Sequence, residues 1–343
     1  MATIKDVARL AGVSIGTVDR IIHNRGRFAS GTARRVKQAI QDLDYTPDIR
    51  ARNLSLSRKC RIAVLMPSGE QDSGYWQLPL GGMKRALAEL ASSHVSADFF
   101  HFDRYNAETY RAAFARMSES EYDGYIVAPL LAAETEKMFE DIYQNKPVVF
   151  FDTDIKSAPR YSFIGQNSKD AGRLAAKLTN LMTRGCKKRI VAVTPDAENE
   201  HLLYRLDGFT EKAELPVTIF RLPAEGKALK NRLEELKGLI REEVCAVYVT
   251  DSSAHVIAEL LEREKLSDRV NLLGFDMVPD NVSYLQKGVI DFILTQRPVD
   301  QGVLSIQTLY KKVIIGTDSE DEQFLPIDII TLENMKTFAD GRF

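Results

Sequence analysis

The chain has 343 residues, of which 44% are hydrophobic and 27% are charged, and its formal net charge is −2. This is the composition of an ordinary soluble globular protein, and the length allows two or three domains. No run of about 18 apolar residues occurs, so the sequence predicts no transmembrane helix. The first ten residues, MATIKDVARL, place charges where a signal peptide requires an apolar core. We therefore expect a cytoplasmic protein.

The three cysteines, Cys60, Cys186 and Cys245, are odd in number and lie far apart in the sequence. Their spacing is typical neither of a metal site nor of a disulfide framework. A reducing compartment fits this usage, and we expect no metal and no cofactor.

Charge divides unevenly along the chain. Residues 1–60 carry 12 Lys and Arg against 5 Asp and Glu, a net charge of +7, whereas the remainder carries 34 against 43, a net charge of −9. A small basic segment before a larger acidic body indicates that only the first segment binds a polyanion. Charge alone leaves open a chance clustering of solvated side chains.

Three short helices are predicted in this basic segment. Thr3 is placed to cap the first helix, which Gly12 ends. Ser14 can cap a second helix over about 15–23, and a third begins near Ser30. Two short helices around a tight turn that contains glycine, with a third helix behind them, predict a helix-turn-helix.

The second helix, IGTVDRIIH, has two different faces at about 100° per residue. Its inner face carries Val18, Ile21 and Ile22. Its outer face carries Gly16, Arg20 and His23. Arg20 can reach a guanine edge with two hydrogen bonds, worth about 1–3 kcal/mol of discrimination. The alternative for Arg20 is a solvated surface charge.

Asp19 lies on the flank of this helix, next to Arg20. Adjacent helical residues do not face each other, so we expect no simple ion pair between them. Asp19 can accept a hydrogen bond from a cytosine amino group or contact His23 one turn later. The DNA-binding interpretation therefore stands despite the carboxylate.

A second basic stretch, DYTPDIRARNLSLSRK, follows the three helices. Pro47 stops the preceding structure, and Asp48 can cap a short helix to about Leu56. Its apolar residues are too few for a core, so this helix is marginal on its own.

These two motifs, TIKDVARLAGVSIGTVDRIIHN and LDYTPDIRARNL, resemble the LacI/GalR family of bacterial transcription regulators. In that family the base-reading positions match Ile15, Gly16 and Arg20. The usual phosphate contacts match Thr3, Ser14, Thr17 and Asn24. The residue that matches Leu54 wedges into the minor groove, and the hinge folds on operator DNA. Serine is common at the position of Asp19, so this chain resembles the subset with TVDR.

From Arg61 onward, β-rich runs alternate with amphipathic helical runs, which predicts parallel sheets covered on both faces. The predicted strands are 61–67, 97–102, 124–130, 147–153, 189–195, 217–223, 246–251, 271–276 and 289–296. About 280 residues exceed one doubly wound domain, so we expect two lobes. The fold class is an all-α helix-turn-helix head and a two-lobed α/β domain like that of periplasmic binding proteins. The expected domains are the head (1–46), a hinge helix and linker (47–60), and a ligand-binding and dimerisation domain (61–343).

Polar and aromatic residues gather where these strands end, the edge at which open α/β sheets bind ligands. The candidate ligand-binding residues are Tyr75, Trp76, Asp152, Arg205, Asp251, Asp276 and Gln296. Planar Asp, Gln and Arg groups suit vicinal hydroxyls, and the aromatic rings can stack on a sugar. The body resembles type I periplasmic sugar-binding proteins, in which these positions contact the ligand.

Each candidate has a structural alternative. The three aspartates could cap the helices that follow, and the two aromatic residues could belong to the core. Arg205 could pair with Asp207 or Glu211 on its own helix, and Gln296 could only shape a crossover.

Two departures from the family pattern concern the ligand. Asparagine is common where Asp251 stands, and a basic residue often occupies the position of Thr153. The predicted site then sets three carboxylates against one arginine, which disfavours an anion. We expect a neutral carbohydrate or related polyol.

The leading hypothesis is a homodimeric repressor on a palindromic operator, controlled by a small sugar. The alternatives are a sugar-binding protein of a transport system and an enzyme on the same scaffold. No GxSxG, Walker, GxGxxG or HExxH motif occurs, and the five histidines show no triad or metal spacing. The sequence does not identify the sugar, or whether it acts as inducer or corepressor.

Overall fold

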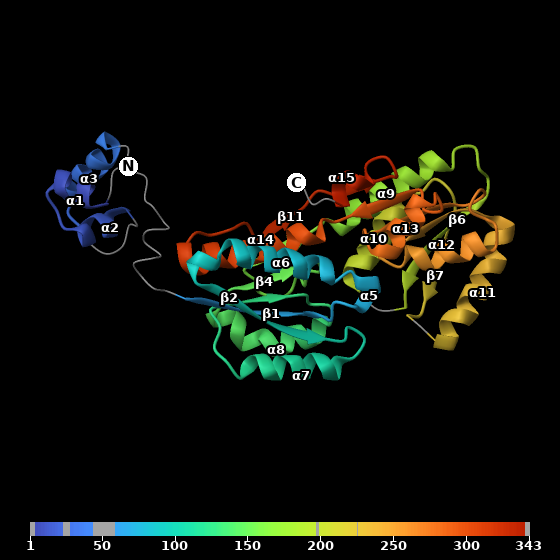
Figure 1. Ribbon diagram of the computed structural model, residues 1–343, viewed down its shortest axis with the longest axis horizontal. Coiled ribbons are helices and arrows are strands. Elements are labelled where there is room, and N and C mark those ends of the chain that lie inside the picture. Colours follow the sequence, from blue (N-terminus) through green and yellow to red (C-terminus); the bar gives the residue numbers. More distant parts are fainter. Residues whose placement is uncertain (1–3, 23–27, 44–58, 197–198, 225, 340–343) are drawn as a thin grey trace. The chain divides into compact units, whose positions relative to one another are not determined.

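The computed structural model describes residues 4–22, 28–43, 59–196, 199–224 and 226–339. The chain forms two compact units, divided between residues 58 and 59 (Figure 1). Within the described residues, no helix is long and apolar enough to cross a membrane.

The described residues of the first unit form three helices: α1 (Ile4–Ala11), α2 (Ile15–Ile22) and α3 (Ser30–Asp42). Gly12 turns the chain between α1 and α2 with a φ of +64°. Ser14 then caps α2, because its hydroxyl accepts a 3.2 Å hydrogen bond from the Thr17 amide. The shared core consists of Val7, Ala8, Ala11, Val18, Ile21, Val36 and Ala39. The predicted helical head is confirmed, whereas the predicted hinge over 47–60 lies almost entirely outside the described residues.

The second unit has two lobes, each built on a six-stranded sheet. The N-terminal lobe has the strand order β11-β5-β4-β3-β1-β2, with all neighbours parallel. Its strands are β1 (Cys60–Pro67), β2 (Val95–Phe102), β3 (Gly124–Val127), β4 (Val148–Phe151), β5 (Ser162–Gly165) and β11 (Glu322–Phe324). Seven of the eight residues of β1 are buried, as expected for a strand covered on both faces.

Helices cover both faces of this sheet (Figure 1). One face packs against α6 (Gln77–Glu89) and α14 (Pro298–Tyr310), and the other against α7 (Ala107–Ser118) and α8 (Ala132–Asn145). The short elements of the lobe are α5 (Gln71–Gly74), η1 (Ala91–Ser93) and the π-helical η2 (Lys311–Ile315).

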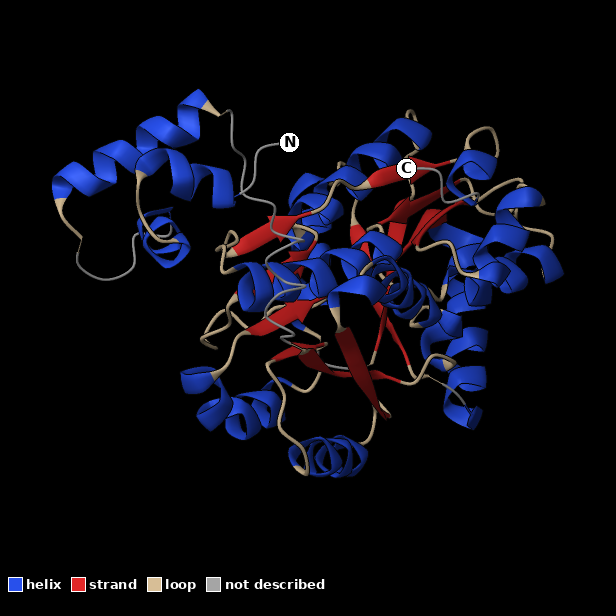
Figure 2. Cartoon of the chain, turned by 60° about the vertical axis from the view of Figure 1, so that its left-hand side comes forward, coloured by secondary structure: helices blue, strands red, loops and turns tan. Residues whose placement is uncertain are grey.

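The C-terminal lobe has the order β12-β10-β9-β8-β6-β7, in which only β12 runs antiparallel to its neighbour. Its strands are β6 (Arg189–Pro195), β7 (Val217–Leu222), β8 (Val244–Val249), β9 (Asn271–Phe275), β10 (Phe292–Thr295) and β12 (Asp328–Ile330). Its helices are α9 (Ser168–Met182), α10 (Glu200–Lys212), α11 (Gly226–Glu243), α12 (Ala254–Arg263), α13 (Pro279–Gln286) and α15 (Met335–Ala339). Two apolar clusters, one on each face of the sheet, form its core, and Figure 2 shows the strands enclosed between helices.

The chain passes between the lobes three times: after β5, after β10, and between β11 and β12. The expected doubly wound, two-lobed architecture is therefore confirmed. Three strands were not predicted, namely β5, β11 and β12. β11 and β12 are edge strands of three residues that include polar side chains, and β5 (SFIG) lies between polar residues without the longer apolar run that marks the other four-residue strands.

Candidate functional site

The outer face of α2 is the candidate DNA interface. Ile15 is 44% exposed, although it is a large apolar residue at the start of the helix. Arg20 is exposed, and its Nε donates a 3.1 Å hydrogen bond to the Gly16 carbonyl, one turn earlier. A Cβ at Gly16 would meet no atom within 4 Å, so this part of the helix leaves space for a close backbone approach.

Ser14 and Thr17 lie beside this surface, with their hydroxyls 2.9 Å apart. Val18 and Ile21 are buried on the opposite side, which confirms the predicted division of faces. Thr3, Asn24 and Leu54 lie outside the described residues, and only the backbone of Asp19 is described, so their roles stay predictions.

A cavity of about 30 Å³ lies between the lobes of the second unit. Its lining includes all seven candidate ligand-binding residues: Tyr75, Trp76, Asp152, Arg205, Asp251, Asp276 and Gln296. Most of them follow the carboxyl ends of strands in both sheets, as the topology of open α/β sheets requires.

Three of these residues form a hydrogen-bonded cluster that joins the lobes. The Tyr75 hydroxyl donates to Asp152 Oδ1 at 2.5 Å. Gln296 Nε2 lies 2.8 Å from the Tyr75 oxygen and 3.3 Å from Asp152 Oδ1. Gln301 Nε2 donates a 3.0 Å hydrogen bond to the backbone carbonyl of Gln296. The Gln296 side chain therefore belongs to the site, and the residue does more than shape the crossover that follows it.

Asp152 and Asp276 follow β4 and β9 in the left-handed region, with φ values of +67° and +66°. This backbone conformation costs free energy for a residue other than glycine and aims both carboxylates into the cavity. Burial raises the pKa of Asp152, and it raises the pKa of Asp276 to about 7. Among the described residues, Asp276 Oδ1 is buried without a hydrogen-bond partner, which leaves it free to accept a bond from a ligand.

Arg205 points inward from α10 and is 1% exposed. Its Nη1 donates to the Thr250 carbonyl at 2.5 Å, and its Cζ lies 3.8 Å from the centroid of the Phe275 ring. The Gln166 carboxamide, with its oxygen turned towards the guanidinium, accepts from Nε at 2.9 Å. The alternative of pairing on its own helix does not hold, because Asp207 pairs with Lys169 and Glu211 with Arg173 and Lys169.

The structural alternative for Asp251, in which its carboxylate caps the helix that follows, holds in part. Its Oδ1 accepts bonds from the amide and the hydroxyl of Ser253, which immediately precedes α12. The same carboxylate lines the cavity, and burial raises its pKa. Tyr75 and Trp76 likewise belong to the N-terminal core and line the cavity at once.

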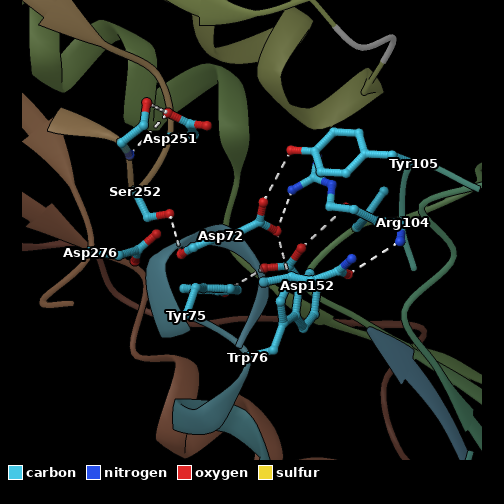
Figure 3. Close-up of polar contacts among 12 residues, drawn as sticks. Asp72, Tyr75, Trp76, Arg104, Tyr105, Asp152, Asp251, Ser252 and Asp276 are labelled. Atoms are coloured by element: carbon cyan, nitrogen blue, oxygen red, sulfur yellow. Dashed lines mark hydrogen bonds and ion pairs between the residues drawn. The ribbon is translucent and has the colours of Figure 1, made fainter. Parts of the chain in front are cut away.

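The structure adds an ion pair that sequence reasoning missed. Asp72 pairs with Arg104 through a 2.5 Å contact to Nη1, and its Oδ2 accepts from Trp76 Nε1 at 2.7 Å (Figure 3). Among the described residues, Arg104 Nη2 is buried without a partner. The Asp72 carbonyl accepts a 2.9 Å bond from the Ser252 hydroxyl of the other lobe.

The Asp72–Arg104 pair changes the predicted set of charged groups in the site. The cavity is lined by four carboxylates and two guanidinium groups, where the sequence predicted three and one. Asp72 and Arg104 follow β1 and β2, so the strand-end signal that found the other residues could also have found them.

His201 is a further missed residue. Its Nδ1 lies 2.7 Å from the Thr153 hydroxyl across the lobes, and burial together with Arg205 lowers its pKa well below the usual value. A neutral imidazole therefore closes this side of the cavity.

Comparison with known proteins places both units. Residues 62–317 match the family described as periplasmic binding protein domain, and residues 3–48 match the bacterial regulatory proteins of the lacI family. The sucrose operon repressor of Lactococcus lactis is 24% identical over 332 residues, covering 96% of this chain and 98% of that protein. The ribose operon repressor of Escherichia coli is 31% identical over 222 residues, covering 61% and 60%.

Among solved structures, a protein from Bacteroides fragilis assigned to the LacI transcriptional regulators superposes with a TM-score of 0.75 and 25% identity. The match covers 82% of this chain and 99% of that one. A helix-turn-helix unit followed by a two-lobed sensor defines a DNA-binding transcription regulator. The chain belongs to the family of the periplasmic binding protein domain, and it carries a DNA-binding domain of the lacI family before that domain.

Proposed function

We propose that this regulator is a repressor whose operator affinity is set by a small neutral carbohydrate bound between the two sensor lobes. The observation that carries the proposal is the cavity itself, which both lobes line with hydrogen-bonding groups. The names of the relatives, sucrose and ribose operon repressors, support both the class of effector and the sense of regulation.

The effector class follows from the available hydrogen-bonding groups. Asp276 Oδ1 lacks a donor and Arg104 Nη2 lacks an acceptor within the described residues. A polyol supplies both, because each hydroxyl donates and accepts. An anion would face four carboxylates against two guanidinium groups that already have protein partners, so its desolvation would not be repaid.

Control of DNA binding requires only that the effector prefer one arrangement of the lobes. Residues from both lobes line the cavity, so closure and binding are linked. We propose that residues 47–60 form the hinge between a head of residues 1–46 and a sensor of residues 61–343. A homodimer would place two heads on a palindromic operator, in the cytoplasm and associated with the nucleoid.

On the operator, Arg20 is proposed to read a guanine, with Ile15, Gly16 and Asp19 along the same groove. Ser14 and Thr17, together with Thr3 and Asn24, would contact phosphates, and Leu54 would enter the minor groove.

Two measurements test the proposal. An electrophoretic shift of the full-length protein on an upstream palindrome should disappear with Arg20→Ala, whereas Arg9→Ala, an exposed arginine on α1, should retain specific binding. Calorimetry should detect neutral monosaccharides or polyols, with no heat from sugar phosphates. Strong binding of a sugar phosphate or nucleotide without a response to neutral sugars would refute the effector class, and turnover of a sugar would favour an enzyme.

A further inference from the structure

Two cysteines that lie 59 positions apart in the sequence come together in the C-terminal lobe. Cys186 lies in the loop between α9 and β6, and Cys245 is the second residue of β8. The register of β6 against β8 shifts at this point: Arg189 pairs with Val244, whereas Ile190 pairs with Ala246. Cys245 is therefore the extra residue of a β-bulge, a device that re-aims a side chain.

The two thiols form hydrogen bonds with the same stretch of backbone. The Lys188 amide donates to Cys186 Sγ at 3.3 Å, and the Cys245 thiol donates to the Arg189 carbonyl at 3.6 Å. Both cysteines are free thiols, so the pair is in the reduced state.

Their surroundings make the two thiols chemically unequal. The loop sequence RGCKKR places the exposed side chains of Arg184, Lys187 and Lys188 around the partly exposed Cys186. Burial opposes ionisation of Cys186, but the Cys245 thiol and the Lys188 amide outweigh it and lower the pKa of the thiol. Burial raises the pKa of Cys245 to about 12. A partly exposed thiol of lowered pKa near a buried second thiol is the arrangement of an attacking and a resolving cysteine.

We propose that Cys186 and Cys245 are an oxidisable pair, which a hydroperoxide converts into a reversible disulfide within the C-terminal lobe. The Cys186 thiolate attacks the peroxide, takes one oxygen as a sulfenic acid and releases hydroxide, which is protonated to water. The Cys245 thiol then attacks the sulfenic sulfur, and its proton leaves with the hydroxyl group as a second water. Two thiols and one hydrogen peroxide thus give one disulfide and two waters, and a dithiol reverses the step.

The pair lies at the amino ends of β6 and β8, whereas the ligand cavity lies at the carboxyl ends of the strands. The disulfide would cross-link the loop before β6 to β8 and would close the segment from Cys186 to Cys245 into a covalent loop. It would not enter the cavity. Oxidation should therefore stabilise the lobe against unfolding while leaving the cavity residues in place.

The test uses the full-length protein treated with hydrogen peroxide, quenched, denatured and alkylated with N-ethylmaleimide. We expect the intact mass before alkylation to fall by ~2 Da, and only Cys60 to be alkylated. A peptide map should link Cys186 to Cys245, and dithiothreitol should restore three alkylation sites. Cys60→Ser is the matched control, since it removes the third thiol and should oxidise like the wild type.

Cys186→Ser and Cys245→Ser should not form the cross-link, and Cys245→Ser should stop at the sulfenic acid or its overoxidation products. The melting temperature should rise by roughly 5 °C or more on oxidation of the wild type and of Cys60→Ser only. The proposal fails if peroxide leaves all three thiols open to alkylation. It also fails if wild-type Cys186 gains only oxygen atoms and never links to Cys245.

Discussion

The guanidinium carbon of Arg205 lies 3.8 Å from the centroid of the Phe275 ring, so a buried cation is stacked on the strand that leads to Asp276. The contact combines a planar charge with an aromatic face inside a site from which water is largely excluded. Arg205 also donates to the Thr250 carbonyl, which fixes it between β8 and β9. Lysine can reproduce the charge of this residue but not its planar geometry.

We therefore expect Arg205→Lys to weaken effector binding by at least about tenfold, which corresponds to ~1.4 kcal/mol. The loss reflects the hydrogen bonds and the ring contact, because the charge is retained. Calorimetric titration with the neutral effector measures it, and Arg173→Lys, on the partly exposed α9 surface, serves as the control. Equal affinities for the wild type and Arg205→Lys would show that guanidinium geometry is unimportant.

The helix that carries Arg205 depends on a close contact between α9 and α10. A Cβ at Gly208 would lie 2.0 Å from the Lys169 carbonyl, and one at Gly172 would lie 1.9 Å from the Arg205 carbonyl. Gly208→Ala should force the helices apart, lowering the free energy of unfolding by about 1–3 kcal/mol and weakening effector binding. Urea unfolding and titration measure the two effects.

Gly238→Ala is the matched control for this substitution. Gly238 is an exposed residue of α11, and a Cβ there would meet nothing within 4 Å. We expect this variant to be up to about 1 kcal/mol more stable, because alanine is the better helix former. If both variants changed stability in the same direction, close packing would not explain the glycine at 208.

The buried carboxyl of Asp276 predicts a pH dependence of stability. Burial raises its pKa to about 7 in the folded protein, whereas an unfolded aspartate titrates near ~3.9. Between these values the folded state binds a proton that the unfolded state has lost, so the contribution of Asp276 to stability falls as pH rises from about 4 to about 7. Burial also raises the pKa of Asp152 and Asp251, which adds to the same trend. The lowered pKa of His201 acts in the opposite direction.

Asp276→Asn should therefore flatten the curve of unfolding free energy against pH. At pH 8 it should gain on the order of 2 kcal/mol relative to its position at pH 4, when both are referred to the wild type. Urea denaturation across this range gives the curve. Asp268→Asn, which changes an exposed aspartate, should keep the wild-type slope. Parallel curves for Asp276→Asn and the wild type would contradict an Asp276 protonated near neutrality.

Asp19 makes a separate prediction about operator choice. If its carboxylate accepts a hydrogen bond from a cytosine, Asp19→Ser should relax the preference at one base pair of each half-site. Affinity for a library of operators with single substitutions measures this. Uniformly tighter binding to every sequence would indicate only the removal of repulsion from phosphates.

Much of this architecture could be predicted from local patterns. The caps and breaks at Ser14 and Gly12 predicted the helix-turn-helix, and the apolar runs predicted nine of the twelve strands in the described residues. The strands β5, β11 and β12 were missed because they lack a longer apolar run, and their pairing depends on neighbours far along the chain.

The residues of the candidate cavity could likewise be predicted only in part from the sequence. Strand ends indicated Tyr75, Asp152, Asp276 and Gln296, since parallel strands bring their carboxyl ends to one edge. Strand ends also indicate Asp72 and Arg104, which follow β1 and β2, but the sequence does not show that these two residues pair, because they lie in segments far apart along the chain. The placement of Cys186 and Cys245 near the same stretch of backbone likewise depends on a bulge in β8 that no spacing in the sequence reveals.

The sequence by itself determined the helix-turn-helix motif, the two-lobed α/β class and the edge of the sheets where ligands bind. These follow from short-range periodicity, capping and strand–helix alternation, which each segment carries on its own. Only the tertiary structure decided which charges are paired, which buried polar atoms lack a partner among the described residues, and which thiols lie near each other. Burial and pairing are set by residues distant in sequence, and their energies depend on the dielectric surroundings that folding creates.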